Sequence, residues 1–391
     1  MWPYAVCFTA SCYFTKVATK YKNHDRKVEY RFFSILAVIF PCLLAALRDS
    51  TVGTDVTVYG DVIFYRSLNM GFVEYIISRN GEYLYLLVVY ICSHIIKKTS
   101  FQYFVLQALT IIPIYCTLQR SKENKYAWYG MLVYYLMLFP YSLNLMRQCI
   151  AIAIIFWGFK YVQERQLRKY LILVFVATMF HTTAVIGLLI YPIYILMTTD
   201  MDSLDESSWG KKHSSSFVVA IAKKYGGFIS CAIILLTIFV LTQFSEIITY
   251  LYMYSEEDYS HFYNQLNSSN LSVIRQYVIL VIPIFALYFL SRKYYNSVDN
   301  DVLPVFTFSI MAIILYQAAT ISAETYRVSL YFHIFVTLFV TKLFYYKTNS
   351  KERWLWMLVI FICLALFWYH FFVGEKWCQI YPYTSEILGI N

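Results

Sequence analysis

Residues 32–47, FFSILAVIFPCLLAAL, form an uncharged apolar run that ends at Arg48 and Asp49. Similar runs recur along the chain, and clusters of Lys, Arg, Asp or Glu separate them. A helix needs about 20 mainly apolar residues to cross roughly 30 Å of hydrocarbon, so this alternation predicts a polytopic membrane protein. Segments of alternating apolar and polar residues, typical of a membrane β-barrel, are not visible. We therefore predict an all-α fold with one transmembrane domain over residues 1–391.

The composition supports the same class. Hydrophobic residues make up 60% of the 391 residues and charged residues only 14%, with a mean hydropathy of +0.54. Soluble domains carry about 25% charged residues. The nine cysteines are scattered singly and never form a CxxC pair, so neither a zinc nor a redox motif is predicted, and buried thiols are expected instead.

About twelve crossings are expected from the lengths of the apolar runs. They lie near residues 1–15, 32–47, 101–118, 127–142, 147–162, 170–182, 184–198, 226–244, 271–290, 302–320, 326–346 and 354–372. The first is predicted to be a retained helix, because it lacks a basic leader and a cleavage site. The run 83–96 is apolar but short, and a crossing there would invert every later loop. We treat it as a re-entrant or interfacial helix.

The basic residues orient this arrangement. Lys and Arg total 32, and 23 of them fall in the loops 16–31, 120–125, 160–169, 199–225, 291–301 and 342–353. The positive-inside rule makes these loops cytoplasmic and places both termini outside. Residues 48–100 and 245–270 then form outer-face connections, which are candidates for handling a substrate. The net charge of +9 is therefore an orientation signal, and nucleic acid is not a predicted partner.

Ionisable residues at the outer ends of helices are the informative positions, because a charge near hydrocarbon is costly and usually faces a partner or water. Four such places occur: Arg48 and Asp49 with the following Gly53, Thr54, Asp55 and Tyr59; Arg147 with Gln148; His181; and Glu324 with Arg327. Guanidinium groups offer forked donors that match two phosphate oxygens. If the three arginines converge, they predict a membrane-embedded anionic ligand such as a phosphate diester or pyrophosphate.

Each place also has an ordinary structural interpretation. Arg48 and Arg147 fit anchors to the lipid headgroups. A single histidine such as His181 between apolar helices is more often a packing residue than a catalyst. Glu324 and Arg327 have the i, i+3 spacing of a local ion pair. Taken one at a time, these residues do not decide a function.

Three ordered segments resemble the EpsG family of Wzy-like bacterial polysaccharide polymerases. RDSTVGTDVTVY at 48–59 resembles the signature loop of that family, NLMRQCIAIAI at 144–154 its second motif, and ATMFHTTAVI at 177–186 its third. The pairs Tyr326-Arg327 and Tyr331-Phe332 are similar to its C-terminal pattern. The matching positions are Arg48, Gly53, Thr54, Asp55, Tyr59, Arg147, Gln148, His181 and Arg327.

The resemblance implies a glycosyltransferase that polymerises oligosaccharide repeat units at the outer face of the bacterial cytoplasmic (inner) membrane, with the active site toward the periplasm or cell exterior. The growing glycan on undecaprenyl pyrophosphate would be the donor, and a lipid-linked repeat unit the acceptor. The fold would be that of a C-type glycosyltransferase, which needs neither a metal nor another cofactor. Whether a chain-length co-polymerase is a partner stays open.

Roles for the site residues follow from the bond that such an enzyme breaks. Arg147 and Arg327, helped by Arg48, would stabilise the departing pyrophosphate. Asp55 or His181 would accept the proton of the acceptor hydroxyl, and the sequence does not choose between them. The residues expected to bind substrate are Arg48, Thr54, Tyr59, Gln148, Glu324 and Arg327, besides the catalytic Asp55, Arg147 and His181.

Two other classes of function compete. A transporter or flippase of lipid-linked oligosaccharide would show two similar halves and charges near the membrane midplane, and neither is visible in the sequence. An O-antigen ligase is a rival among enzymes and stays open. The DxD pairs Asp200-Asp202 and Asp299-Asp301 lie in predicted cytoplasmic loops, and we interpret them as solvated faces without a metal.

Overall fold

The computed structural model describes residues 1–78, 82–198, 284, 286–288, 302–317, 326–346 and 350–390. Within them the chain is helical, and the expected all-α class is confirmed. The α-helices are α1 (Trp2–Asn23), α2 (Lys27–Ala46), α3 (Val62–Asn69), α4 (Phe72–Ile77), α5 (Tyr83–Ile95), α6 (Thr99–Arg120), α7 (Ala127–Met137), α8 (Phe139–Asn144), α9 (Met146–Gln163), α10 (Leu167–Thr178), α11 (Ile190–Thr198), α15 (Val302–Gln317), α16 (Tyr326–His333), α17 (Phe335–Tyr346) and α18 (Ser350–Trp368). Short 3-10 or π-helical segments are η1 (Val56–Asp61), η2 (Asn124–Tyr126), η3 (Thr182–Leu189), η7 (Tyr369–Gly374) and η8 (Trp377–Gln379).

Among the described residues, four helical segments are long and apolar enough to cross a membrane: Lys27–Ala46, Thr99–Arg120, Tyr326–Tyr346 and Ser350–Gly374. Shorter apolar helices are Tyr83–Ile95, Thr182–Thr198 and Val302–Ile313. The expected total of about twelve crossings stays a prediction. The crossing expected at 226–244, nearly all of that at 271–290, and the loops expected at 199–225 and 245–270 lie outside the described residues.

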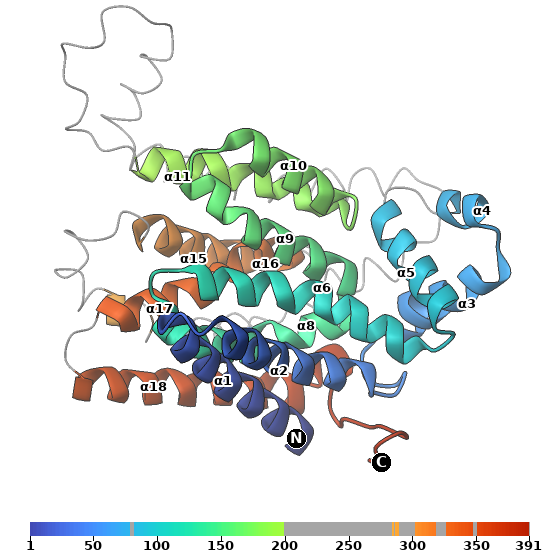
Figure 1. Cartoon of the computed structure of the whole chain (residues 1–391), viewed down its shortest axis with the longest axis horizontal. Coiled ribbons are helices and arrows are strands. Elements are labelled where there is room, and N and C mark those ends of the chain that lie inside the picture. Colours follow the sequence, from blue (N-terminus) through green and yellow to red (C-terminus); the bar gives the residue numbers. More distant parts are fainter. Residues whose placement is uncertain are drawn as a thin grey trace, which may run out of the picture.

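Two helical hairpins turn by the same local device. Asp25 lies two residues after the end of α1, and Arg165 lies two residues after the end of α9. Both have a left-handed backbone, with φ of 55° and 56°. In each turn the next amide donates to a carbonyl five residues back, Arg26 to Tyr21 at 3.0 Å and Gln166 to Tyr161 at 2.7 Å. These bonds satisfy carbonyls that the helix end leaves free. Consequently α1 with α2, and α9 with α10, run as antiparallel neighbours (Figure 1).

Helices α3, α4 and α5 lie together at one end of the bundle (Figure 1). Glu82, just before α5, bonds to the start of α9. Beyond α5, the first turn of α6 returns to the same end, where Gln102 donates to the Gly60 carbonyl at 3.3 Å and Tyr103 donates to Asp61 at 2.5 Å. Both ends of α5 therefore lie at this end, and α5 does not carry the chain across the bundle. We call it the α3–α5 end.

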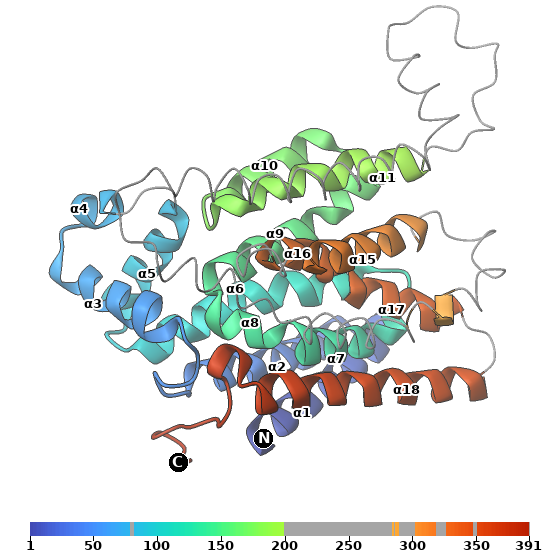
Figure 2. The same ribbon diagram turned by 180° about the vertical axis from the view of Figure 1, so that it is seen from behind.

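Helices α7, α9 and α17 are largely buried in the core. Every residue from Phe335 to Phe344 of α17 is buried. Helix α16 packs between α9 and α15 (Figure 2). Close packing depends on Gly130 of α7, because a Cβ there would lie 2.7 Å from the Thr341 Cγ2 atom and 3.1 Å from Leu118. Three helices meet at this glycine without room for another methyl group.

After α18 the chain turns back along the α3–α5 end, and residues 375–390 form a segment that we call the C-terminal strap. The two termini lie near each other (Figure 1), and Tyr4 donates to the Ile380 carbonyl at 2.7 Å. Tyr383 donates to the Leu44 carbonyl at 2.9 Å. The strap thus covers the start of α1 and the end of α2. The sequence of the strap has no periodic pattern that would predict this packing.

We expect Gly130→Ala to lower stability, because the new methyl group would overlap Thr341, and overpacking of this kind costs about 1–3 kcal/mol. The measurement is thermal unfolding of the purified protein in detergent. Thr341→Ser removes the clashing Cγ2 atom and should restore much of the loss in the double variant. Gly71→Ala is the matched control, because nothing lies within 4 Å of a Cβ at that position. Equal unfolding temperatures for Gly130→Ala and Gly71→Ala would contradict this packing.

Candidate functional site

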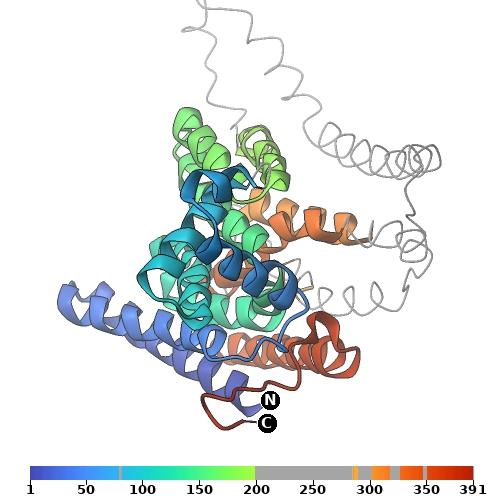
Figure 3. The same cartoon turned by 90° about the vertical axis from the view of Figure 1, so that its right-hand side faces the viewer.

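Segments distant in the sequence meet at the α3–α5 end, which faces the viewer in Figure 3. They are the loop after α2, the residue before α5, the junction of α8 and α9, the turn between α10 and η3, and the start of α16. Hydrogen bonds, ion pairs and ring contacts connect them. Three of the sequence motifs singled out above therefore lie at one place in the fold.

Glu82 is the centre of this arrangement. Its Oε2 atom forms an ion pair with the Arg147 guanidinium, and its Oε1 atom lies 3.0 Å from Nδ1 of His181. The residue is only 8% exposed. Burial by itself raises the pKa of Glu82, but the hydrogen bonds from His181 and Arg147 outweigh it and hold the pKa below its ordinary value. The carboxylate is thus ionised and orients both partners.

Arg147 is held between the carboxylate and two aromatic rings. Its guanidinium carbon lies 4.5 Å from the Tyr59 ring and 5.8 Å from the Tyr85 ring, distances at which a cation is attracted to a ring face. Among the described residues, its one hydrogen bond is to Glu82. Because guanidinium carries five N–H donors, most of the donors of Arg147 can still bind an anion.

Asp55 lies between two positive charges. It is half-buried, and burial raises its pKa, while the charges of Arg327 and Arg147 and a hydrogen bond with Thr54 act in the opposite direction. Gln148 donates to the backbone carbonyl of Arg327 at 2.7 Å. This bond joins the start of α16 to the start of α9, so the two arginines are brought near one carboxyl group.

Arg48 lies apart from this group. It is 6% exposed, donates to the Leu143 carbonyl at 2.8 Å, and contacts the Met146 sulfur at 3.8 Å. Its guanidinium carbon lies 5.0 Å from the Tyr103 ring, and it interacts electrostatically with the carboxylate of Asp61. Arg48 therefore supports the junction of α8 and α9, where its contact Met146 directly precedes Arg147.

The loop that carries Asp55 is fixed by Gly53 and the C-terminal strap. Gly53 has a φ of +113°, and a Cβ there would lie 2.7 Å from Oδ1 of Asn144, so only glycine fits this close approach. Its amide donates to the Gln379 carbonyl at 3.0 Å, and Asn144 donates to the Cys378 carbonyl at 2.9 Å. The C-terminal strap thus holds both the loop that carries Asp55 and the α8–α9 junction.

The structure places the expected site residues as follows. It brings together Asp55, Tyr59, Arg147, Gln148, His181 and Arg327. Thr54 is exposed beside Asp55, and Arg48 is buried in separate surroundings. Glu324 lies outside the described residues.

The sequence prediction missed Glu82 and Tyr85. A signal for Glu82 was available, because it is a carboxylate directly before the apolar run 83–96. Its partners are 65 and 99 residues away, and no short-range pattern points to them. Tyr85 is one of 39 tyrosines, so residue type alone does not distinguish it.

Chemically, the arrangement offers two guanidinium groups, an imidazole held by a carboxylate, and a second carboxyl group with a raised pKa. Among the described residues, Nε2 of His181 makes no hydrogen bond, whereas Nδ1 faces Glu82. A carboxylate on one ring nitrogen fixes the tautomer, so that the other nitrogen can accept a proton. In the same part of the chain, no three His, Cys, Asp or Glu side chains form a group that could hold a metal ion.

Comparison with known families settles the relationship. The sequence model of the EpsG family matches residues 31–385. The chain belongs to the EpsG family. The match spans all the segments that build the site, and with the apolar helices it identifies a membrane-embedded EpsG protein. Neither a curated protein nor a solved structure matches the chain.

Replacing Glu82 in this EpsG protein by Gln should lower the free energy of unfolding at neutral pH by about 2–3 kcal/mol, because charge-assisted hydrogen bonds to two partners are weakened. The pKa of Glu82 is lowered by folding, so its contribution is present above its ordinary pKa of 4.5 and is lost as the pH falls through the lowered value. The difference between wild type and variant should therefore shrink at acid pH. Chemical unfolding in detergent from about pH 4 to pH 8 measures it.

Glu74→Gln is the control, because Glu74 is an exposed carboxylate of α4 at the same end. It makes the same change in charge and should leave stability unchanged over this range. A Glu82→Gln variant that unfolds like Glu74→Gln at neutral pH would show that the Glu82 contacts contribute little.

Proposed function

We propose that this EpsG protein is a polysaccharide polymerase. It transfers a growing glycan from undecaprenyl pyrophosphate to a lipid-linked oligosaccharide repeat unit at the outer face of the cytoplasmic membrane. Family membership supports a polymerase of this type. The lipid carrier, the membrane face and the absence of a metal requirement are parts of the proposal.

One observation carries the proposal: Arg147 and Arg327 both act on the half-buried Asp55, beside an imidazole held by Glu82. Two guanidinium groups at one place suit a ligand with two phosphates, because each group offers a fork that matches two oxygens. The site also lies at the end of the bundle opposite most of the basic loops, as expected for an outer-face site.

Arg147 and Arg327 would bind the pyrophosphate and stabilise the charge that develops on it as the anomeric carbon bond breaks. Such stabilisation accelerates the reaction when the donors are already oriented. Arg147 meets this condition, since Glu82, Tyr59 and Tyr85 fix its guanidinium. The leaving group departs as lipid pyrophosphate, and the acceptor hydroxyl forms the new glycosidic bond.

His181 is the base that we propose for the acceptor hydroxyl. Glu82 on Nδ1 leaves Nε2 to take the proton, and the carboxylate stabilises the imidazolium that forms. Asp55 is less suited to this role, because it faces two arginines that compete for its oxygens. We assign Arg48 a positioning role, because it is buried and its terminal nitrogens face Leu143 and Met146 at the α8–α9 junction.

Arg147→Lys should lower polymerisation roughly hundredfold, because lysine keeps the charge but loses the forked donors. The assay incubates purified protein with synthetic repeat units on lipid pyrophosphate and separates the products on a ladder gel. Thermal stability should change little, since a lysine can still pair with Glu82. Full activity of Arg147→Lys would mean that Arg147 serves only as an anchor.

Arg48→Lys should behave differently. Because Arg48 is buried and bonds to the Leu143 carbonyl, we expect activity and unfolding temperature to fall together. A variant with wild-type stability and strongly reduced binding of the lipid pyrophosphate would instead make Arg48 a direct ligand of the substrate.

His181→Gln should lower turnover by about 10²- to 10⁴-fold, the usual contribution of a general base, with little change in acceptor affinity. Asp55→Asn should retain much more of the turnover than His181→Gln. If Asp55→Asn instead loses turnover to this extent and His181→Gln retains it, Asp55 is the base.

The same preparation tests the rival transporter function. Wild-type protein that makes no ladder but moves the lipid-linked repeat unit across liposomes would replace the polymerase by a transporter.

A further inference from the structure

A hollow lies at the end of the bundle opposite the α3–α5 end. It has a volume of about 380 Å³ and is formed by the end of α1, by η2 with the start of α7, and by the start of α18. Four cationic side chains line it, Lys16, Lys20, Lys125 and Arg353, and so does His24. None of the described residues that line it is acidic. We call it the basic pocket.

Three aromatic rings stand among these cations: Tyr126, Trp128 and Trp354. The Lys16 ammonium lies 5.4 Å from the Trp128 ring, and the Arg353 guanidinium carbon lies 5.5 Å from the Tyr126 ring. Among the described residues, Lys16, Lys20 and Lys125 take part in no ion pair. The ring contact orients Lys16 without neutralising its charge, so the three lysines keep their positive charge for an anion.

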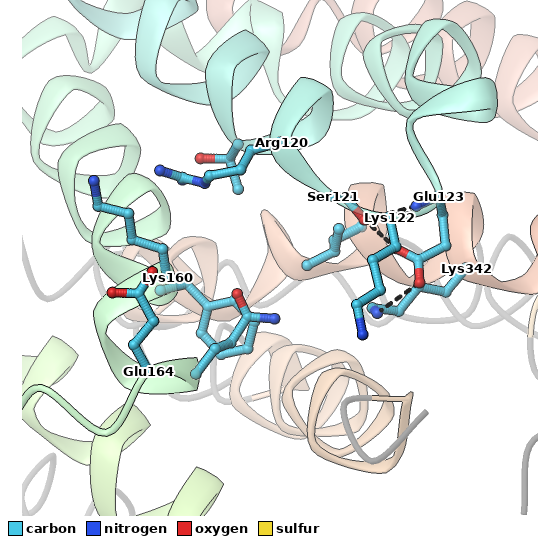
Figure 4. A pocket seen from close by; sticks show the side chains of 11 residues that line it. Arg120, Ser121, Lys122, Glu123, Lys160, Glu164 and Lys342 are labelled. Carbon is cyan, nitrogen blue, oxygen red and sulfur yellow. Dashed lines mark hydrogen bonds and ion pairs between the residues drawn. The ribbon is translucent and has the colours of Figure 1, made fainter. Parts of the chain in front are cut away.

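A neighbouring hollow of about 310 Å³ provides an internal comparison (Figure 4). It also has four cations, Arg120, Lys122, Lys160 and Lys342, but Glu123 and Glu164 line it as well. Lys342 pairs with Glu123 at 3.2 Å, and both side chains are almost fully buried. Two carboxylates therefore offset part of the positive charge of this hollow, whereas no described residue that lines the basic pocket is acidic.

The ligand should also have an apolar part. Trp354 of α18 lines the basic pocket, and Leu358 and Phe361 follow it at i+4 and i+7, which places them on one face of the helix. These side chains are 61%, 54% and 42% exposed. A stripe of exposed apolar residues thus leads from the pocket along the outside of the bundle, where hydrocarbon chains of the bilayer would lie.

We propose that the basic pocket binds the phosphate-bearing headgroup of an anionic phospholipid, with its acyl chains along the exposed face of α18. Lysines donate to the phosphate oxygens, and tryptophans lie at the level of the headgroups, where such rings prefer to be. The lipid joins α1 to α18 on the face where most of the basic loops lie. This inference does not rest on the proposed polymerase activity.

Native mass spectrometry of the full chain in a neutral detergent tests the proposal. The ligands are phosphatidylglycerol, phosphatidylcholine with the same acyl chains, and glycerol phosphate without chains. We expect phosphatidylglycerol to bind most tightly. Lys16→Gln with Lys20→Gln should weaken its binding roughly ten- to thirtyfold, as expected for two lysines near a headgroup, without changing unfolding of the lipid-free protein, because both side chains are exposed.

Lys97→Gln with Lys98→Gln is the matched control, since it removes two exposed lysines at the α3–α5 end and should leave binding unchanged. Equal affinity for the two phospholipids would overturn the proposal. So would a loss of binding in Lys122→Gln with Lys160→Gln that the basic-pocket variant does not share. Glycerol phosphate that binds as tightly as the lipid would mean that the pocket holds a free phosphate ligand and that the apolar stripe contributes nothing.

Discussion

A carboxylate at the edge of an apolar bundle keeps its charge only where donors replace the water it has lost. Glu82 has two such donors, and each of its oxygens takes one, Arg147 or His181. The requirement links the start of α5, the start of α9 and the turn after α10. Removal of either donor would leave a poorly solvated charge, so the three segments hold each other in place. The orientation of the imidazole and of the guanidinium is a consequence of this one pairing.

A second requirement concerns the backbone of the loop that follows α2. Amide and carbonyl groups near a membrane need partners within the protein, and the C-terminal strap supplies them. Asp49 donates to the Thr384 carbonyl at 3.1 Å, and Gly53 donates to that of Gln379 at 3.0 Å. In return, the Glu386 amide donates to the Asp49 carboxylate at 2.8 Å. Asp55 is therefore positioned by residues more than 300 positions away in the chain.

The sequence predicts the helices well where they are apolar. The run expected at 147–162 is α9 (Met146–Gln163), and the run expected at 326–346 coincides with α16 and α17. Hydropathy marks the part of a helix that suits hydrocarbon, not its end, which is why α1 continues to Asn23, beyond the expected limit of residue 15. The short helices α3 and α4 and the C-terminal strap carry no such signal. They are stabilised by tertiary hydrogen bonds, which the local sequence does not encode.

The candidate site could be predicted in residue types but not in pairings. Ionisable residues at helix ends stand out in a chain with 14% charged residues, and this contrast pointed to Asp55, Arg147, His181 and Arg327. Which arginines share a site depends on the direction of each side chain. Arg48 follows an apolar helix much as Arg147 precedes one, yet it points to Tyr103 and the Leu143 carbonyl.

The balance of charge adds a constraint on the proposed mechanism. Glu82 and Asp55 together offset Arg147 and Arg327, so a pyrophosphate that enters must compete with a carboxylate for the arginines. Glu82 stays deprotonated because its pKa is lowered, whereas burial raises the pKa of Asp55. The positive charges of Arg147 and Arg327 oppose this increase in the pKa of Asp55. When the two arginines bind the ligand, its negative charge offsets theirs, and the pKa of Asp55 rises further. By linkage, protonation of Asp55 and binding of the anion favour each other. Under the proposed function, Asp55 is thus the carboxyl group that yields the arginines to the substrate, while Glu82 keeps Arg147 and His181 in place.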